Sequence, residues 1–295
     1  MPVSPEDLRR RAESLQWFHS IDLGQGVVTQ GLSEIVLPDG ALPDFRGRSV
    51  LDVGAWDGYY SYLAERRGAR RVVALDHYAW GVDIPARDTY WRECARTGHL
   101  PDHRRDVTDF WRPDLPGKRG FDFAHEVFDS KVESVVADFT ELDPGQLGVF
   151  DIVIYCGVLY HMKEPLTCLE RVRAVTGEVA VIETEALHLQ HMEASPLCQF
   201  RAADEVGGDF GNWWVPTLPA LEALVRSAGF GSATTVVGPP LPGSADPNGH
   251  GGGGRPGIVE RVGRRVVHAL VENPGPAPAP SAPSQHYRAV LHARP

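Results

Sequence analysis

Short apolar runs alternate with helical patterns between residues 49 and 181, and this alternation constrains the fold more than any other feature. The runs that read as buried strands are SVLDVG (49–54), RVVALD (71–76), VESVVAD (132–138), FDIVIYC (150–156) and EVAVIE (178–183). Helical patterns separate them at YYSYLAERRG (59–68), 121–130 and PLTCLERVRAV (165–175). Continuous apolar strands joined by helices predict an α/β fold with a parallel sheet that is covered on both faces.

The pattern divides the chain into four parts. Residues 1–46 are expected to form an N-terminal helical cap, with a helix from Asp7 to Phe18, and residues 47–240 to form the core. Within the core, residues 77–120 are long for a connection between two strands, so we expect this insertion to be a lid or an acceptor-binding region. Residues 241–284 are rich in glycine and proline and predict a flexible linker with one candidate helix (258–272), followed by a final core strand at 285–295.

Composition narrows the classes of partner. The 29 Lys and Arg residues against 39 Asp and Glu give a net charge of −10, and no basic run is present, which argues against binding to nucleic acid. No apolar run approaches the roughly 20 residues of a membrane span, and the N-terminus lacks the apolar region of a secretory signal. Four widely spaced cysteines without a CxxC pair suit a reducing compartment. We therefore predict a cytoplasmic protein with a small-molecule partner and no membrane partner, and homodimerisation stays open.

The segment LDVGAWDGYYS (51–61) places a glycine-containing loop between a strand and a helix. Gly54 and Gly58 allow tight turns and a close approach of a ligand to the backbone. The glycine that lets a pyrophosphate approach in dinucleotide-binding proteins is replaced here by Trp56. This replacement disfavours NAD and favours a cofactor without phosphate, such as S-adenosylmethionine. Asp52, near the end of the strand, is expected to receive the ammonium group of that cofactor.

Three further segments follow strands and complete a cofactor site at the carboxyl edge of the sheet, where open α/β sheets bind ligands. Asp76 lies 22 positions after Gly54, where an acidic residue grips a ribose diol; a solvated loop acid is the alternative. Asp138 is expected to accept from an adenine amino group, with Phe139 flanking the ring, and CGVLYH (156–161) is the third segment. The predicted cofactor residues are Trp17, Asp52, Gly54, Ala55, Trp56, Gly58, Asp76, His77, Asp138, Phe139, Cys156 and Tyr160.

The chain resembles the bacterial tRNA wobble-uridine (5-oxyacetyl or carboxymethyl) methyltransferases and their small-molecule methyltransferase relatives. The resemblance is carried by VLDVGAWDGYYSYLAERRGA, FDIVIYCGVLYHMKEPLTCLERV and NWWVPTLPALEALVRSAGF, within residues 15–76, 121–237 and 285–295. It implies the class I methyltransferase fold, which is a Rossmann-like, mostly parallel seven-stranded sheet with helices on both faces. It also implies that HYRAVLHAR (286–294) forms an antiparallel last strand and that Arg288 lies near the reacting end of the cofactor.

The chain departs from that family where a carboxylated cofactor would be held. In the tRNA enzymes, lysines and a tryptophan before the glycine loop hold the extra carboxylate. This chain has no lysine before Lys118, and Gly31 stands about where the tryptophan would be. We therefore expect methyl transfer from S-adenosylmethionine to an oxygen, or a nitrogen, of a small molecule such as a bacterial secondary metabolite. The alternatives are a tRNA wobble-uridine carboxymethyl- or methyltransferase and a non-catalytic protein that binds S-adenosylmethionine.

Candidate catalytic and acceptor residues follow the fourth and fifth strands. His161 is the predicted general base, with Tyr160 beside it, because histidine titrates near neutrality; a histidine held in a structural turn is the alternative. The paired tryptophans 213 and 214 are expected either to stack on the acceptor or to pack in the core. The stretch IETEALHLQH (182–191), expected after the fifth strand, predicts a polar pocket edge rather than a metal site, because its spacing matches no defined metal motif. No metal is expected, and the predicted substrate-binding residues are Trp213, Trp214, Arg288, Glu185 and His188.

Overall fold

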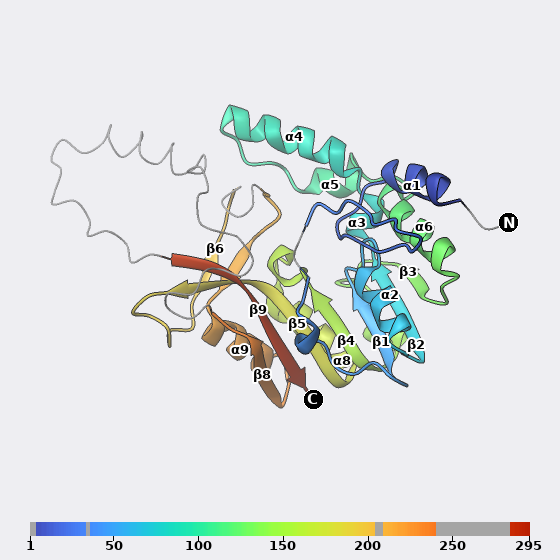
Figure 1. Ribbon diagram of the computed structural model, residues 1–295. Helices are drawn as coiled ribbons and strands as arrows, with labels where there is room; N and C mark the ends of the chain where they lie inside the picture. Colours follow the sequence, from blue (N-terminus) through green and yellow to red (C-terminus); the bar gives the residue numbers. More distant parts are fainter. Residues whose placement is uncertain (1–3, 34–35, 204–208, 240–283) are drawn as a thin grey trace.

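A seven-stranded sheet forms the centre of the fold. The computed structural model describes residues 4–33, 36–203, 209–239 and 284–295. The strands follow the order β3-β2-β1-β4-β5-β9-β8, and β9 alone among them runs antiparallel to its neighbours, β5 and β8 (Figure 1). These strands are β1 (Ser49–Val53), β2 (Arg71–Asp76), β3 (Glu133–Val136), β4 (Phe150–Cys156), β5 (Thr176–Leu189), β8 (Ser232–Val237) and β9 (Ser284–Arg294). A separate two-stranded sheet pairs β6 (Cys198–Phe200) with β7 (Trp214–Pro216).

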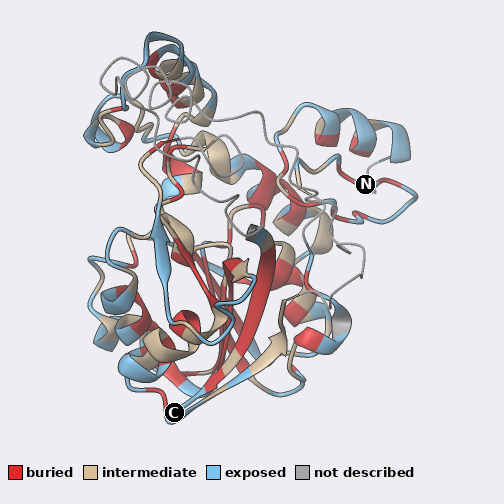
Figure 2. Cartoon of the chain, turned by 90° about the vertical axis from the view of Figure 1, so that its left-hand side faces the viewer, coloured by how far each residue is buried: buried red, intermediate tan, exposed pale blue. Residues whose placement is uncertain are grey.

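Helices cover both faces of the sheet, as the alternating pattern predicts. One face, which carries Val50 and Ile152, packs against α1 (Pro5–Glu13), α2 (Tyr59–Arg66) and α6 (Arg119–Phe128). The other face, which carries Leu51 and Val153, packs against α7 (Pro144–Leu147), α8 (Pro165–Val175) and α9 (Leu218–Ser227). Successive side chains of a strand point to opposite faces, so consecutive residues of one strand enter different halves of the core. The buried strands lie between helices whose outer surfaces are exposed (Figure 2).

The predicted sheet is confirmed, and one of its strands is longer than expected. All six strands predicted from the sequence are present, including the antiparallel last strand. The expectation that IETEALHLQH follows the fifth strand is wrong, because β5 continues to Leu189. The cause is β9, which pairs with β5 from Ala180 to Leu189 and so keeps this stretch extended. The sequence patterns did not predict β8, β6 or β7, which are short or rich in polar residues.

The N-terminal helix ends earlier than its pattern predicts. The side chain of Ser4 accepts a hydrogen bond from the amide of Asp7 and caps the start of α1, which stops at Glu13 rather than at Phe18. The other described residues of the cap form the short 3₁₀ helix η1 (Asp39–Ala41) and one isolated bridge between Asp22 and Val28. The predicted linker at 241–284 and its candidate helix lie outside the described residues, apart from Ser284.

The insertion at residues 77–120 forms helices of its own. They are α3 (Tyr78–Gly81), α4 (Ile84–Thr97), α5 (Arg104–Thr108) and the 3₁₀ helix η2 (Pro116–Lys118). Asp83 caps α4 by accepting a hydrogen bond from the amide of Ala86, and Gly98 ends it at a φ of +76°. Figure 1 shows α4 and α5 beyond the carboxyl edge of the parallel strands, on the side to which the β6–β7 hairpin also extends. Among the described helices, none is both long and apolar enough to cross a membrane.

The burial of β9 leads to a test of the fold. The side chain of Leu291 is fully buried between β5 and β8, so Leu291→Ala should lower the free energy of unfolding by about 2–5 kcal/mol. Leu100→Ala is the matched control, because Leu100 is 59% exposed and should change stability by less than about 0.5 kcal/mol. Urea unfolding measures both variants. If they lose equal stability, β9 does not belong to the core.

Candidate functional site

Six polar side chains gather on one face of the sheet at the carboxyl ends of its central strands. This is the face that packs against α2, and the six residues share it because they occupy alternating positions along their strands. Glu185 is the register partner of Arg288, and Cys156 is the register partner of Glu183. Four of the six are carboxylic acids and one is a guanidinium, so the patch is acidic. Its members are Asp52, Asp76, Cys156, Glu183, Glu185 and Arg288.

The glycine loop after β1 borders this patch. Gly54 is exposed and adopts a φ of +78°, where a side chain would collide with the methyl of Val158 at 2.5 Å. Trp56 also adopts a positive φ, +43°, which is unusual for a residue with a side chain and costs about 1–3 kcal/mol. Its ring stacks on Phe18 with centroids 4.4 Å apart, and its carbonyl accepts a hydrogen bond from Nε1 of Trp80 at 2.6 Å. The loop is therefore held in a glycine-like conformation by contacts on both sides of Trp56.

Asp76 ties the end of β2 to two neighbouring segments. One oxygen accepts from the amide of Trp56 at 2.9 Å, and the other accepts from the amide of Ala79 in α3 at 3.0 Å. Burial raises the pKa of Asp76 to about 6, although these backbone hydrogen bonds oppose the shift. The sequence predicts Asp76 as a ligand for a ribose, and the structure shows that it also has a structural role, because it holds the glycine loop and α3 together.

Asp52 lies beside Asp76 on the neighbouring strand. Its carboxylate accepts a hydrogen bond from the hydroxyl of Ser61 in α2 at 2.6 Å. Burial raises the pKa of Asp52 to about 6, and the negative charge of Asp76 adds to the shift. Both hydrogen bonds to this buried carboxylate come from Ser61, which is neutral, so the carboxylate gains from a nearby cation. Binding the ammonium group of the cofactor is the role that the sequence predicts for Asp52.

Asp57 and His19 are functional candidates that the sequence reasoning missed. The carboxylate of Asp57 accepts from the amides of Phe18 and His19 at 2.9 and 2.6 Å, and it lies 2.8 Å from Nδ1 of His19. Asp57 therefore fixes the N-terminal segment against the glycine loop and brings Phe18 onto Trp56. The only signal in the sequence is an acidic residue inside the loop, and nothing in its spacing identifies the distant partner.

Arg288 is enclosed by two carboxylates. Its guanidinium binds Glu183 through Nε and through Nη2, the latter at 2.7 Å, and its Nη1 lies 3.3 Å from Glu185. The second oxygen of Glu183 also accepts from the amide of Gly157 at 2.7 Å. Burial raises the pKa of Glu185, but hydrogen bonds from His286 and the charge of Arg288 outweigh it and leave the pKa below its usual value. Arg288 thus lies beside the predicted site with its charge already compensated.

Tyr160 and Cys156 lie beside this ion pair. The guanidinium of Arg288 lies 4.8 Å from the centre of the Tyr160 ring, which belongs to the 3₁₀ helix η3 (Leu159–His161). Burial raises the pKa of Tyr160, although Arg288 opposes the shift, so the phenol stays neutral. Burial also raises the pKa of Cys156, and the charges of Glu183 and Asp52 raise it further. Cys156 is therefore a protonated thiol rather than a nucleophile.

His161 is held in one orientation. Its Nδ1 lies 2.9 Å from the carbonyl oxygen of Gly211, and because a carbonyl only accepts, Nδ1 carries the proton and Nε2 carries the lone pair. Burial lowers the pKa of His161, although Asp209 opposes the shift. The ring is therefore neutral at physiological pH, which is the protonation state that a general base needs.

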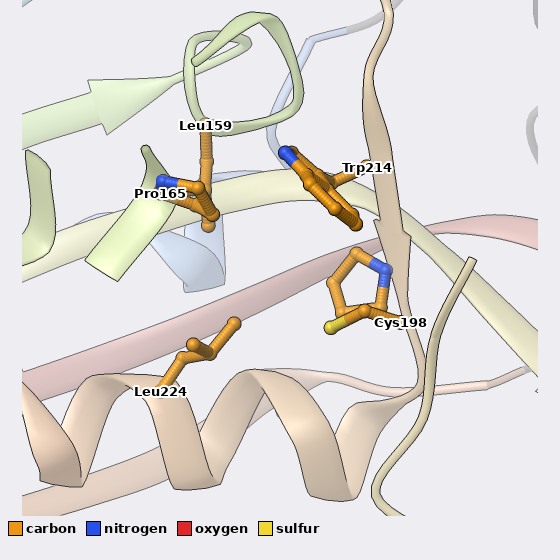
Figure 3. A pocket seen from close by; sticks show the side chains of 6 residues that line it. Leu159, Pro165, Cys198, Trp214 and Leu224 are labelled. Carbon is orange, nitrogen blue, oxygen red and sulfur yellow. The ribbon is translucent and has the colours of Figure 1, made fainter. Parts of the chain in front are cut away.

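The tryptophan before β7 and the first residue of β7 contact different parts of the chain. Trp213 lies 4.7 Å from the ring of His103 in the insertion, and its amide donates to the carbonyl of Tyr160 at 2.7 Å. Trp214 instead lines an apolar cavity of about 140 Å³ with Cys198 and with Leu224 of α9 (Figure 3). Successive residues of an extended segment point to opposite sides, so Trp213 contacts the insertion and Trp214 lines the cavity beside α9. The ring of Phe200 contacts both, with centroids 6.3 and 5.0 Å away.

Several predicted residues lie outside the site. Trp17 packs on Phe123 and donates from Nε1 to the carbonyl of Ala12, so it belongs to the core beneath the cap. The ring of Phe139 is also buried in the core, near Tyr155, and is not open to a ligand. His188 lies on the opposite face of β5 from Glu185, because the two are three positions apart. The contacts give these three residues positions apart from the patch, and their binding roles stay predictions.

Three further residues predicted to bind the cofactor, Asp138, His77 and Ala55, contact residues close to them in the structure. Asp138 accepts from the amide and the hydroxyl of Thr140 at 2.8 and 2.7 Å, in the turn after β3. His77 stacks on Trp111 with centroids 4.4 Å apart, and Ala55 is buried under the glycine loop. Among the described residues, no three His, Cys, Asp or Glu side chains are arranged to hold a metal ion.

Comparison with known proteins reveals distant relatives. No protein-family model matches the chain. The tRNA U34 carboxymethyltransferase of Pseudomonas syringae pv. tomato is 28% identical over 191 residues, which cover 63% of this chain and 46% of that protein. The protein of the same name from Pseudomonas aeruginosa (strain LESB58) is 27% identical over 201 residues, covering 65% and 48%. The resemblance found in the sequence is confirmed, and the chain spans about half the length of the curated relatives it matches.

Solved structures identify the fold. The N-terminal domain of EvdMO1 with SAH bound superposes with a TM-score of 0.53 at 20% identity, over 80% of this chain and 91% of that one. The same domain in the presence of SAH and D-fucose gives a TM-score of 0.54 at 17% identity, over 99% and 97%. The chain has the class I methyltransferase fold. In this methyltransferase fold, the patch and the glycine loop lie at the carboxyl edge of the sheet.

The raised pKa of Asp52 leads to a pH-dependent test of stability. The folded protein binds this proton more tightly than the unfolded chain does, so ionised Asp52 destabilises the fold fully above about pH 6. The cost falls as the pH drops from about 6 toward the ordinary pKa of an aspartate, about 4. Asp52→Asn should therefore stabilise the protein relative to wild type by about 2 kcal/mol more at about pH 7.5 than at about pH 4.5. Urea unfolding at the two pH values measures the difference. Asp114→Asn, on the exposed surface, is the control, and an equal response of both variants would contradict a buried charge.

Proposed function

We propose that the chain binds S-adenosylmethionine and transfers its methyl group to a hydroxyl oxygen of a small molecule in the cytoplasm. The observation that carries the proposal is the neutral, oriented imidazole of His161, whose ring lies 4.3 Å from that of Tyr160 at the edge of the patch. An amine acceptor needs only to lose its proton to solvent, whereas a hydroxyl acceptor benefits from a base that is already unprotonated. A bacterial secondary metabolite is the kind of acceptor that the small site and the net charge of −10 favour over nucleic acid.

The residues of the patch fit this cofactor. The exposed backbone of Gly54 leaves room for the amino-acid part, and Trp56 occupies the place where a pyrophosphate would need open space. Asp52 would hold the ammonium group, and Asp76 would hold the ribose with the lone pairs that its backbone donors leave. When bound, the cofactor supplies a methyl group on a positively charged sulfur. The acidic patch favours such a cation, and the bound cation would lower the pKa of Asp52 and Asp76.

Around the reacting centre, the chain supplies a base and excludes water. His161 would take the proton of the acceptor hydroxyl on Nε2, while the carbonyl of Gly211 holds Nδ1–H and fixes the tautomer. Tyr160 stays a neutral phenol under Arg288 and forms one wall of the site. Trp213 and the insertion form the opposite wall and shield the site from solvent, which strengthens every electrostatic contact inside it.

Carboxymethyl transfer to a tRNA wobble uridine is the second candidate, and it is favoured by the names of the curated relatives. Arg288 argues against it. A cofactor with an extra carboxylate needs a cation with an uncompensated charge, and here Glu183 and Glu185 already bind that guanidinium. An added carboxylate would meet two others at short range and would be repelled. Ordinary methyl transfer avoids this conflict.

Calorimetric titration with S-adenosylmethionine and with its carboxylated form tests the proposal. Wild-type protein should bind the plain cofactor at least about tenfold more tightly. Glu185→Gln removes one of the two charges that compensate Arg288 and keeps the shape of the side chain. The preference should then move toward the carboxylated cofactor by about tenfold, because a hydrogen bond to a charged group contributes about 1.5–3 kcal/mol.

Glu193→Gln is the matched control for that variant. Glu193 is an exposed acid in the turn after β5, and its replacement should leave the preference unchanged. A wild-type preference for the carboxylated cofactor would favour the second candidate. Failure to bind either cofactor would refute both.

A further inference from the structure

The insertion packs directly on the segment that orients His161. Trp91 of α4 lies 6.0 Å from the ring of Phe210, and its indole comes within 3.4 Å of the place where a side chain on Gly211 would begin. Gly211 is the residue whose carbonyl binds Nδ1 of His161. A ligand between α4 and this segment would therefore lie next to the proposed base.

Two buried polar atoms at this junction have no hydrogen-bond partner among the residues that the structure describes. They are Nε1 of Trp91 and Oδ1 of Asp106, and their residues are only 5% and 4% exposed. The second oxygen of Asp106 accepts from the hydroxyl of Tyr78 at 3.0 Å and lies 3.4 Å from Nδ1 of His103. His103 connects the two residues, because its ring also lies 5.3 Å from that of Trp91. The unpartnered donor and the unpartnered acceptor thus belong to one cluster.

The chemistry of the two atoms specifies their missing partner. An indole N–H only donates, and a carboxylate only accepts. A hydroxyl both accepts and donates, so hydroxyl groups of a ligand satisfy both atoms, which a purely apolar ligand cannot do. Leaving buried polar atoms unpartnered is unfavourable. The insertion and the segment around Gly211 are therefore expected to separate, to admit such a ligand and to pack together again around it.

The surroundings favour a neutral ligand with a flat apolar face. Rings of Trp91, His103 and Trp213 follow one another across the junction, with centroid separations of 5.3 and 4.7 Å. Arg87 offers no uncompensated charge to an anion, because it is paired with Asp88 at 2.6 Å and lies 4.0 Å from the centre of the Trp91 ring. An anionic ligand would in addition face the carboxylate of Asp106.

We propose that this junction, formed by Trp91, His103, Asp106 and Trp213, is the acceptor site and that it takes a neutral polyhydroxylated ring, such as a sugar. The hydroxyls of the ring bond to Trp91 and Asp106, and its apolar face lies against the aromatic side chains. This inference rests on the proposed function, because it names the class of acceptor that His161 would deprotonate.

Binding of methyl glycosides of glucose, galactose and fucose to the full chain tests the site, with catechol as the planar aromatic comparison. Saturation-transfer NMR in the presence of S-adenosylhomocysteine (SAH) should detect at least one glycoside. Asp106→Asn and Trp91→Phe should each weaken that binding at least about tenfold, whereas the affinity for SAH, measured by calorimetry, stays unchanged. Asp109→Asn makes the same chemical change on an exposed residue three positions along and should have no effect.

The outcomes separate this inference from the proposed function. If SAH binds but no glycoside does, or if only catechol binds, the acceptor class is wrong and the cofactor proposal stands. Glycoside binding that neither variant at the junction weakens would overturn the location. An ordered water that joins Trp91 to Asp106 in a crystal structure of the glycoside complex would overturn it as well. If SAH itself does not bind, the proposed function is refuted, and the acceptor site that rests on it is refuted with it.

Discussion

Carboxylates that accept hydrogen bonds from backbone amides hold several loops of the candidate site in place. Asp57 binds the amides of residues 18 and 19 and fixes the N-terminal segment, and Asp76 binds the glycine loop and α3. Glu183 binds Gly157 in the loop after β4, and Asp209 stabilises a local turn by binding Gly211 at 2.6 Å. Because Asp57, Asp76 and Glu183 accept from amides of other elements, they fix the position of those elements at the site. Loops that would otherwise be joined to the sheet only at their ends gain a second attachment.

This arrangement concentrates negative charge, and the concentration explains several properties of the site. Burial raises the pKa of Asp52 and Asp76 to about 6, so both acids oppose folding near neutral pH. Arg288 compensates two further acids, both on the neighbouring strand β5. A site with this balance gains stability from a bound cation and resists an anion. The same balance therefore supports a positively charged cofactor and argues against an acidic transferred group or an RNA acceptor.

The periodic features of the fold could be predicted from the sequence, and the contacts between distant residues could not. Alternating apolar runs identified six strands, and the order of Gly54, Asp76 and Tyr160 along them identified the edge where the site lies. The continuation of β5 to Leu189 depends on pairing with β9, about a hundred residues later, and local pattern does not reveal such pairing. Trp17 and Phe139 resemble ligand-stacking aromatics in sequence, but their burial is decided by which helix lies over them.

Among the site residues, too, those in a local pattern could be predicted and those that depend on distant contacts could not. Asp52 and Asp76 lie near the carboxyl ends of β1 and β2, where the sequence pattern places a ligand site, so their positions were predictable. Asp57 and His19 were not, because an acid that binds backbone amides needs no particular residue in its partner. The neutral state of His161 is likewise a consequence of burial and of the carbonyl of Gly211, which only the folded chain brings to it.

Native mass spectrometry of the full chain tests the central claim most directly. The protein is incubated with equal concentrations of S-adenosylmethionine, its carboxylated form and NAD, and is then exchanged into volatile buffer. The acidic site with a compensated Arg288 predicts a retained mass that corresponds to one S-adenosylmethionine. Retention of the carboxylated cofactor or of NAD, or of none of the three, would contradict the account.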